Sequence, residues 1–472
     1  MPMRAVRVLL CGFMALFSVM TKTNQTPFYY DQPALAGIAH KLLDLARQFG
    51  ATDASSEVSE HAGLSVSVRM GSLETIEQTR DRSAAVSVYK GYRRGHATTS
   101  DLSDQALAAA VKRALDIASH TAEDPFSGLP EKRYQPTEQR DLDLFHPWSV
   151  RAEQAADMAL AAEAAARSVS PLIKNSEGAG VSASHGQFFS ANTAGFSGGY
   201  PYSRHWLSVA PIAQRGKAMQ RDDWYTTSRR PEELASPQDI GRYAARRALS
   251  RLGAKKIPTG QWPVIFEAPF AVGLMGSLVH ALSGSALYRR ASFLLDAKGQ
   301  RIFPDHIEID EDPFVPGAAG SAPFDDEGVA VCPRKLIDRG VVQGYFLSMY
   351  TARKLSMQPT GHAGGAHNLR LSSRLTKPKD DLAALIKTMG KGLLVTEVMG
   401  QGVNGLTGDY SRGAFGYWVE NGQIVHPVEE ITIAGNLKEM YAGLVAVGSD
   451  ETTRGTKTTG SILLDRMTIA GS

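Results

Sequence analysis

Hydrophobic residues in the first quarter of the chain follow two different spacings. A helix is predicted first, because apolar side chains recur every three or four residues, at Leu35, Ile38, Leu42, Leu45 and Phe49. Residues 64–68 alternate apolar and polar side chains and residues 84–89 form a second apolar run, which predicts two strands. Gly71 and residues 91–95 separate these runs as turns. The pattern therefore predicts a helix followed by an antiparallel meander.

Further helices and strands precede a polar linker. Helical spacing recurs over residues 103–119, 150–169 and 239–252, and the glycine- and serine-rich residues 177–203 are predicted to form strands with tight turns. Residues 254–260 combine Pro and Gly with polar residues, as linkers do. We therefore expect an α+β fold of two domains. Residues 27–253 form a mixed domain that contains the meander, and residues 261–472 form a largely β domain with a few helices.

A glycine-rich segment, residues 400–422, resembles a nucleotide-binding turn. Gly400, Gly402 and Gly405 match G-x-G-x-x-G, and an apolar run over residues 393–399 comes before them. That fingerprint binds a dinucleotide only where a helix follows the third glycine. No helical pattern follows here, and Asn421-Gly422 predicts a two-residue hairpin turn between strands. We therefore expect β-structure in which glycines let the backbone pass close to another chain or a peptide.

Composition and charge narrow the class of protein. With 472 residues, 43% of them hydrophobic and 21% charged, the chain is long enough for two or three cores. The net charge of +3 and the scattered Lys and Arg residues give no basic face, so we expect no nucleic-acid partner. Cys11 and Cys332 are the only cysteines, which is typical of a reducing compartment and predicts a cytoplasmic protein.

The N-terminal extension, residues 1–26, points another way. Arg4 and Arg7 precede an apolar run over residues 8–20 that has the length of a signal-peptide core. No small-x-small cleavage site follows in residues 21–26, and the run is too short to span a bilayer. Met20 offers another start site. We therefore favour a misassigned start over an export signal, and expect no membrane partner.

Several separate motifs in the second half carry a family resemblance. In chain order they are LYRRASFLLDAKGQRIFPD, SAPFDDEGV, GGAHNLRL, MGQGVNGLTGDYSRGAFGYWVENG, EITIAGNL and SILLDRMTIAG. Together they resemble the TldD/PmbA family of peptidases, also called modulators of DNA gyrase, and within it the PmbA (TldE) branch. The resemblance implies a two-domain α+β fold. It also implies a role in the proteolysis of unfolded peptides, such as maturation of microcin precursors and degradation of an antitoxin.

The zinc ligands of the TldD branch are missing from this chain. That branch carries a His-Glu-x-x-x-His helix and a cysteine near its C-terminus. Alignment without a gap puts Met275 at the first histidine, Gly276 at the glutamate and His280 at the second histidine. Lys457 stands where the branch has its cysteine. A thioether, a glycine and an ammonium group cannot replace imidazole, carboxylate and thiolate on Zn²⁺. We therefore expect no metal or other cofactor in this chain, and zinc in a TldD-type partner.

Two other histidines, His362 and His367, flank the glycine-rich residues 363–366. Glycine at this density is incompatible with the helical spacing that sets two histidines on one face, so we predict loop histidines without a metal.

A binding role is then predicted for the residues around the glycine-rich segment. The predicted lining residues are Gly400, Gly402, Asn404, Asp409 and Tyr410, with His367 and Asn368 as polar neighbours. Main-chain pairing with an extended peptide would accept many sequences. The alternative interpretation is that these residues only form tight turns and pack the β domain.

Two functions remain open. The first is a subunit that binds unfolded peptides and walls a chamber in a hetero-oligomer with a zinc-bearing TldD-type subunit. The second is a metallopeptidase active by itself, through an unrecognised site or a metal held by His280 and residues remote in sequence.

Overall fold

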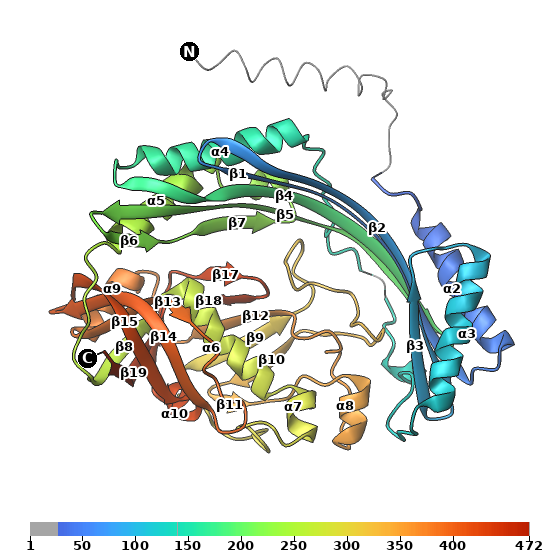
Figure 1. The fold of residues 1–472 in the computed structure, drawn as a ribbon. Coiled ribbons are helices and arrows are strands. Elements are labelled where there is room, and N and C mark those ends of the chain that lie inside the picture. Colours follow the sequence, from blue (N-terminus) through green and yellow to red (C-terminus); the bar gives the residue numbers. More distant parts are fainter. Residues whose placement is uncertain (1–26, 139, 472) are drawn as a thin grey trace, which may run out of the picture.

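The computed structural model describes residues 27–138 and 140–471, which form two parts (Figure 1). A long curved sheet with helices on its outer face arches over a second part that is rich in strands. This arrangement confirms the predicted α+β fold. The N-terminal extension, with its alternatives of misassigned start and export signal, lies outside the described residues.

The curved sheet is antiparallel throughout. Its strand order is β3-β2-β1-β4-β5-β6, and β7 also pairs with β5. The bounds are β1 (Asp53–Arg69), β2 (Ser72–Lys90), β3 (Arg93–Thr99), β4 (Ile173–Asn192), β5 (Ser197–Arg215), β6 (Ala218–Arg221) and β7 (Trp224–Ser228). The first three strands are the predicted meander.

The prediction of several tight turns within residues 177–203 is wrong. The structure has one hairpin there, because β4 and β5 pair over almost their whole length and a single turn joins Asn192 to Ser197. The glycines serve close packing within the strands instead. A Cβ on Gly199 would overlap the Phe188 carbonyl oxygen of the neighbouring strand. Glycine inside a strand commonly marks such a close approach.

Four helices cover the outer face of the curved sheet (Figure 1). They are α2 (Gln32–Gln48) and α3 (Asp104–His120) at one end, and α4 (Ala152–Ser168) and α5 (Pro237–Ser250) at the other. All four match predicted helices. The Ser103 and Ser236 side chains accept hydrogen bonds from the first turns of α3 and α5, which fixes where these helices begin. Two short 3₁₀ helices, η1 (Lys132–Tyr134) and η2 (Pro231–Glu233), lie in the connections.

The second part contains two six-stranded sheets around one large core. The first has the order β11-β10-β9-β12-β18-β17. Its strands are β9 (Ile307–Asp312), β10 (Arg334–Asp338), β11 (Val341–Val342), β12 (Asn368–Ser373), β17 (Thr452–Arg454) and β18 (Lys457–Thr459). The second has the order β15-β14-β13-β8-β19-β16. Its strands are β8 (Gly260–Phe266), β13 (Gly392–Met399), β14 (Asp409–Glu420), β15 (Gln423–Asn436), β16 (Leu444–Val447) and β19 (Ile462–Ala470).

Five helices belong to this second part. They are α6 (Ala268–Ala281), α7 (Gly284–Tyr288), α8 (Met349–Lys354), α9 (Leu382–Met389) and α10 (Leu437–Ala442). Helix α6 packs against β13, β17 and β18 and therefore touches both sheets. None of the helices in the described residues is long and apolar enough to cross a membrane.

The local predictions for residues 400–422 are confirmed. No helix follows Gly405, and the next regular element is β14. Asn421 and Gly422 have φ values of 53° and 69°, as a two-residue turn between β14 and β15 requires. The segment is thus part of a hairpin and lacks the helix that a dinucleotide site needs.

Candidate functional site

Helix α6 contains Met275, Gly276 and His280, which the resemblance aligns with the His-Glu-x-x-x-His motif of the TldD branch. Met275 is 1% exposed and packs in the apolar core with Leu274 and Leu278. The hydroxyl of Tyr441 donates a hydrogen bond of 2.9 Å to the Leu274 carbonyl and closes this side of the helix. The first ligand position therefore points into a hydrophobic interior.

The second histidine position points to the surface. His280 is exposed, five residues after Met275. Gly276, at the glutamate position, has no atom of a neighbouring segment within 4 Å of where a Cβ would stand. These residues do not fit a zinc ion, since a buried thioether and a glycine replace two of the groups that the ion and its attacking water need.

Lys457, which the resemblance puts at the cysteine position of the TldD branch, is the first residue of β18. Burial lowers the pKa of its ammonium group. Because α6 packs against β18, the helix and the strand that would carry zinc ligands do lie side by side. However, Met275, Gly276 and Lys457 provide no imidazole, carboxylate or thiolate to bind the ion.

The loop between β13 and β14 lies against His280. A Cβ on Gly405 would stand 3.2 Å from Nε2 of His280. The carbonyl of Gly405 also accepts a hydrogen bond of 2.9 Å from the backbone N–H of Phe293. His280 of α6 therefore lies next to the glycine-rich loop that the sequence analysis predicted to bind peptide.

Hydrogen bonds within the loop use most of its polar groups. Asn404 Oδ1 accepts from the backbone N–H of Leu406, and the Asn404 N–H donates to the Asp409 carbonyl. Asp409 accepts from the Thr407 hydroxyl and from Asn436, and these two hydrogen bonds lower the pKa of its carboxyl group. The turn interpretation accounts for both predicted lining side chains, Asn404 and Asp409.

Two further predicted lining residues need correction. Tyr410 is 4% exposed within the main core, where burial raises the pKa of its hydroxyl. A Cβ on Gly402 would overlap the Ser411 carbonyl oxygen, so the space at this glycine is filled by the chain's own β14. Gly400 differs, because no atom of a neighbouring segment lies within 4 Å of its Cβ position. Of these three residues, only Gly400 faces open space.

His367 and Asn368 belong to the other sheet of the second part, at the start of β12. The ring of His367 is hydrogen-bonded to the carbonyls of Gly320 and Gly361. Asn368 Oδ1 accepts from the Gly320 N–H, and Asn368 Nδ2 donates to the Asp312 carbonyl. Both side chains therefore hold the connection between β9 and β10 instead of joining the loop at residues 400–410.

A buried charge cluster lies next to these residues. The Glu311 carboxylate accepts from Nε of Arg334 at 2.7 Å and lies 3.1 Å from Nε2 of His362. Burial alone would raise the pKa of Glu311, but the bond to His362 and the charge of Arg334 lower it to about 2. Burial lowers the pKa of His362. The ring nitrogens of His362 and His367 are engaged in hydrogen bonds, which agrees with their prediction as loop histidines.

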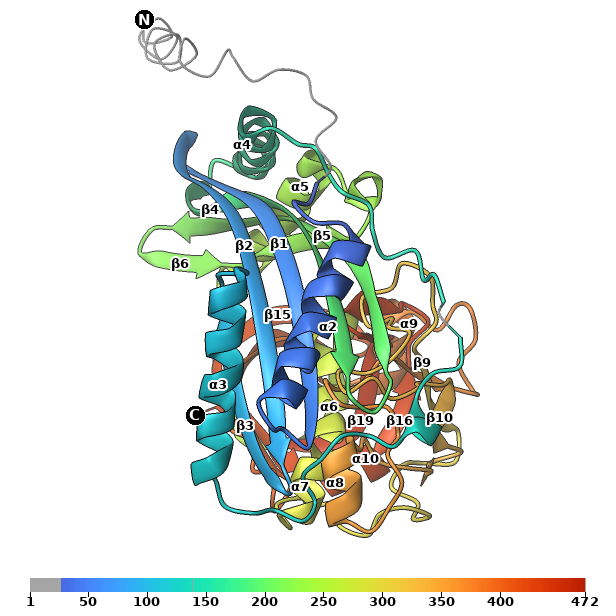
Figure 2. The ribbon, with the colours of Figure 1, turned by 90° about the vertical axis from the view of Figure 1, so that its right-hand side faces the viewer.

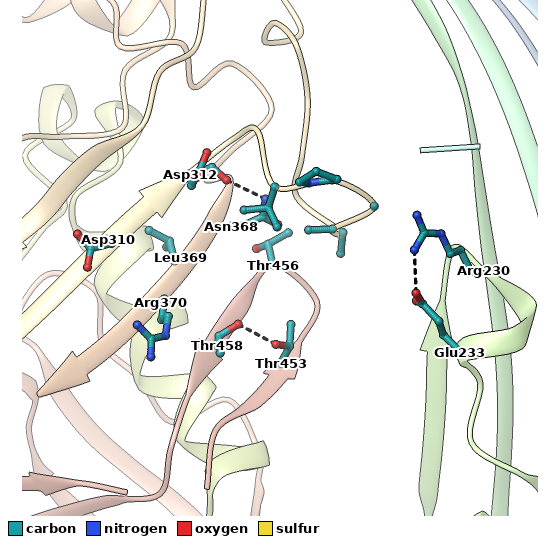
Figure 3. Close-up of a pocket in the computed structure, with 15 residues that line it drawn as sticks. Arg230, Glu233, Asp310, Asp312, Asn368, Leu369, Arg370, Thr453, Thr456 and Thr458 are labelled. Atoms are coloured by element: carbon teal, nitrogen blue, oxygen red, sulfur yellow. Dashed lines mark hydrogen bonds and ion pairs between the residues drawn. The ribbon is translucent and has the colours of Figure 1, made fainter. Parts of the chain in front are cut away.

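A cavity of about 520 Å³ opens between the two parts of the molecule (Figure 3). Figure 3 shows Arg230, the residue before η2, and Glu233, the last residue of η2, facing the ends of β9, β12 and β18 across this space. The remaining lining residues come from these strands, from β17, from the turn between β17 and β18 and from the loop at residues 315–319. They are Asp310, Asp312, Val315, Pro316, Gly317, Ala318, Ala319, Asn368, Leu369, Arg370, Thr453, Thr456 and Thr458. The sequence predicted only Asn368 among them.

Contacts between the two parts hold the walls of this cavity together. Arg229 donates to the carbonyls of Ala318 and Ala319, both at 3.3 Å, and so fixes the loop on one rim. The guanidinium of Arg454 stacks 3.9 Å over the ring of Tyr225 and 4.4 Å over that of Trp224. The cavity therefore exists only where the curved sheet and the second part meet.

Most charged groups that line the cavity already have partners. Arg230 pairs with Glu233 and Asp143, Arg370 with Glu451, and Asp310 with Lys335. Asp312 has no ion-pair partner among the described residues, and one of its carboxylate oxygens accepts a hydrogen bond from the Phe314 N–H. The cavity thus offers an acidic group whose charge is not neutralised by the protein.

Known proteins resemble this chain over nearly its whole length. Models of the first, central and C-terminal domains of PmbA/TldA metallopeptidases match residues 57–118, 145–252 and 259–471. The chain is 44% identical over 414 residues to metalloprotease PmbA of Escherichia coli O157:H7, covering 88% of this chain and 91% of that protein.

Solved structures show the same fold. A Bacteroides thetaiotaomicron protein described as a modulator of DNA gyrase superposes with a TM-score of 0.86 at 27% identity, covering 92% of this chain and 98% of that one. TldE of Thermococcus kodakarensis shares the fold with a TM-score of 0.80 at 20% identity, covering 92% and 100%. The chain belongs to the PmbA/TldD metallopeptidase family.

Proposed function

We propose that this chain is the peptide-binding subunit of a two-subunit peptidase whose zinc ion is held by a TldD-type partner. The observation that carries the proposal is the set of side chains at the family's ligand positions. Met275 lies in the apolar core, Gly276 has no side chain and Lys457 is a cation. A catalytic zinc ion needs three protein donors such as imidazole, thiolate or carboxylate. Such donors must then come from another subunit.

The cavity between the two parts is the proposed peptide site. Strand β17 pairs only with β18 among the described strands, so its outer edge can add an extended peptide by main-chain hydrogen bonds. Pairing of this kind does not depend on side-chain identity, as unfolded substrates of varied sequence require. The unpaired carboxylate of Asp312 favours peptides that present a Lys, an Arg or a free amino terminus.

Two of the sequence-predicted groups keep a role in this proposal. Asn368 lines the cavity and holds its rim through its bonds to Gly320 and Asp312. The loop with Gly400, Asn404 and Asp409 is a proposed second contact, for the peptide or for the partner subunit, because Gly400 faces open space. This loop lies beside His280 on helix α6.

A metallopeptidase active by itself is the second candidate. The name metalloprotease carried by the Escherichia coli relative favours it. In this chain it would need His280 and two further donors, and no group of three His, Cys, Asp or Glu side chains in residues 27–138 and 140–471 is arranged to hold a metal ion. The two candidates differ in what the isolated chain does to a peptide, which is binding alone or binding and cleavage.

Fluorescence anisotropy with labelled unfolded peptides tests the binding role. We expect the isolated chain to bind a lysine-rich peptide more tightly than an uncharged one of the same length. Asp312→Asn should weaken binding of the basic peptide by about tenfold and leave the uncharged peptide unchanged, since one charge-assisted hydrogen bond is worth roughly 1.5–3 kcal/mol. Asp305→Asn, an exposed carboxylate outside the cavity lining, is the control. Equal binding by the Asp312 variant and the unmodified protein would contradict this site.

A further inference from the structure

One edge of the curved sheet is long, exposed and unpaired. Strand β1 pairs with β2 along the whole of β2, but β3 covers only the stretch from Ala84 to Lys90. Among the described residues, no strand lies on the other side of residues 72–83. In Figure 2 this stretch runs along the border of the sheet, above the end of β3.

The free edge is not covered by another element and is not interrupted by proline or glycine, although it carries charged side chains. Residues 72–82 are all exposed, so neither a helix nor a loop covers them. The stretch contains no proline and no glycine, and its pairing with β1 is regular from Thr75 onward. Leu73 and Ile76 are 52% and 50% exposed. A long, uncovered edge of this kind can act as a template for another strand.

The order of charges along the edge favours antiparallel pairing with a second copy of the same segment. Glu74 and Glu77 lie in its first half, whereas its second half carries Arg80, Asp81 and Arg82 and so keeps a net positive charge. A second copy of the same segment, paired antiparallel, therefore places each acidic half against a basic half. Parallel pairing in register would oppose every charge to its like, which is unfavourable on a sheet.

One antiparallel register satisfies the charges best. When Gln78 faces Gln78 of the second copy, Glu74 faces Arg82 in both directions. The other two acidic residues of the edge then face threonines, Glu77 opposite Thr79 and Asp81 opposite Thr75. Moving the two-fold axis to residue 77 would instead oppose Glu77 to itself. Arg82 is available for this pairing, because its only hydrogen bond within the described residues is from Nε to the Ser100 carbonyl. Arg80 stays with its own chain, stacked over the Tyr29 ring at 3.6 Å.

We propose that residues 72–83 of β2 pair with the same residues of a second copy of this chain, so that two curved sheets join into one continuous sheet. The contact is a self-complementary two-fold interface. An axis perpendicular to the sheet keeps the inner faces of both arches on the same side, because directly opposed residues of antiparallel strands project to the same face. This inference does not rest on the peptide-binding role.

Analytical ultracentrifugation of the full chain tests the pairing. We expect a dimer whose dissociation constant rises about tenfold or more in Glu74→Arg and in Arg82→Glu, since each change opposes two like-charged pairs across the interface. The double variant E74R/R82E restores both pairs in reversed order and should recover the dimer. Because all these side chains are exposed, circular dichroism and thermal unfolding should match the unmodified protein.

Cysteine cross-linking tests the register. In a chain with Cys11 and Cys332 changed to Ser, Gln78→Cys should form an intermolecular disulfide on oxidation, because position 78 faces itself. Gln105→Cys, exposed on α3, should not. A monomer at tens of micromolar, or a dimer that the single charge reversals leave unchanged, would overturn the proposal. So would dimerisation that appears only after removal of residues 1–26, or pairing of this edge solely with a TldD-type subunit.

Discussion

Arg247 on α5 and Glu267, the residue immediately before α6, form a buried ion pair in which Nη1 of Arg247 lies 3.1 and 3.0 Å from the two carboxylate oxygens. The side chains are 10% and 13% exposed. Arg247 also binds Asp222 and the carbonyl of Thr396. Burial raises the pKa of Glu267 despite the charge of Arg247. The pair ties the outer helices of the curved sheet to the helix that carries the former ligand positions.

Removing Arg247 should therefore destabilise the whole molecule. In Arg247→Met the carboxylate of Glu267 stays buried without its cation, and we expect a loss of about 3–5 kcal/mol in the free energy of unfolding by urea. Arg242→Met on the same helix is the matched control, because Arg242 is half exposed and its pair with Asp239 is long, at 3.7 Å. It should cost no more than about 1 kcal/mol. Equal losses in the two variants would contradict a structural role for the buried pair.

The cluster around Glu311 predicts a loss of stability in acid. Its pKa of about 2 in the folded protein lies below the ordinary value of 4.5. The ionised carboxylate therefore stabilises the fold above about pH 4.5, and this contribution is lost as the pH falls toward 2. A shift of this size corresponds to about 3 kcal/mol. Urea unfolding of Glu311→Gln should show a smaller drop between pH 5 and pH 3 than the unmodified protein.

The control for this pH effect is Glu430→Gln, whose exposed carboxylate pairs with Lys256 at the surface. It should leave the pH dependence unchanged, because an exposed pair contributes little. If Glu311→Gln retained the full drop between pH 5 and pH 3, another group would be responsible for it.

Filling the cavity should block peptide binding without disturbing the fold. Thr456 lines the cavity from the turn between β17 and β18, and a Trp there would occupy space that the peptide needs. We expect Thr456→Trp to weaken binding of an unfolded peptide by at least about tenfold in anisotropy titrations, the scale set by a change of 1.4 kcal/mol. Thr388→Trp, exposed on α9, is the control. Unchanged affinity in the Thr456 variant would move the peptide site elsewhere.

Replacing glycine by alanine should have opposite effects on stability at Gly402 and Gly276. At Gly402 a Cβ would overlap the Ser411 carbonyl oxygen, so Gly402→Ala must displace β14 and should cost about 1–3 kcal/mol. At Gly276, on α6, a Cβ meets open space, so Gly276→Ala should stabilise the protein by up to about 1 kcal/mol. Thermal unfolding of the two variants measures both effects. A gain from Gly402→Ala would show that the loop has room that the structure does not give it.

Local sequence signals predicted the elements well. The spacing of Leu35, Leu42 and Phe49 predicted α2, and Asn421-Gly422 predicted the turn between β14 and β15. Each of these features depends on neighbours in the chain, because periodicity and turn chemistry act over a few residues.

The sequence did not predict most residues of the candidate site, because the site is formed by residues that are far apart in the chain. Arg230 and Thr456 face one cavity although more than 200 residues separate them, and no local pattern marks either one. Tyr410 and His367 look polar and available in the sequence, but one lies in the core and the other is tied to Gly320 and Gly361. The substituted ligand positions at Met275 and Lys457 could be found from the sequence, because they depend on a family pattern instead of on folding.

In the proposed complex this chain binds peptide, and a TldD-type partner supplies zinc and cleavage. Zinc content and chelator-sensitive peptide cleavage can be measured for the chain alone, the partner alone and the two together. We expect no bound zinc and no cleavage for this chain alone, with zinc and the fastest cleavage in the combined sample, and His280→Ala should change neither. Stoichiometric zinc and chelator-sensitive cleavage by the isolated chain, abolished by His280→Ala, would contradict this proposal.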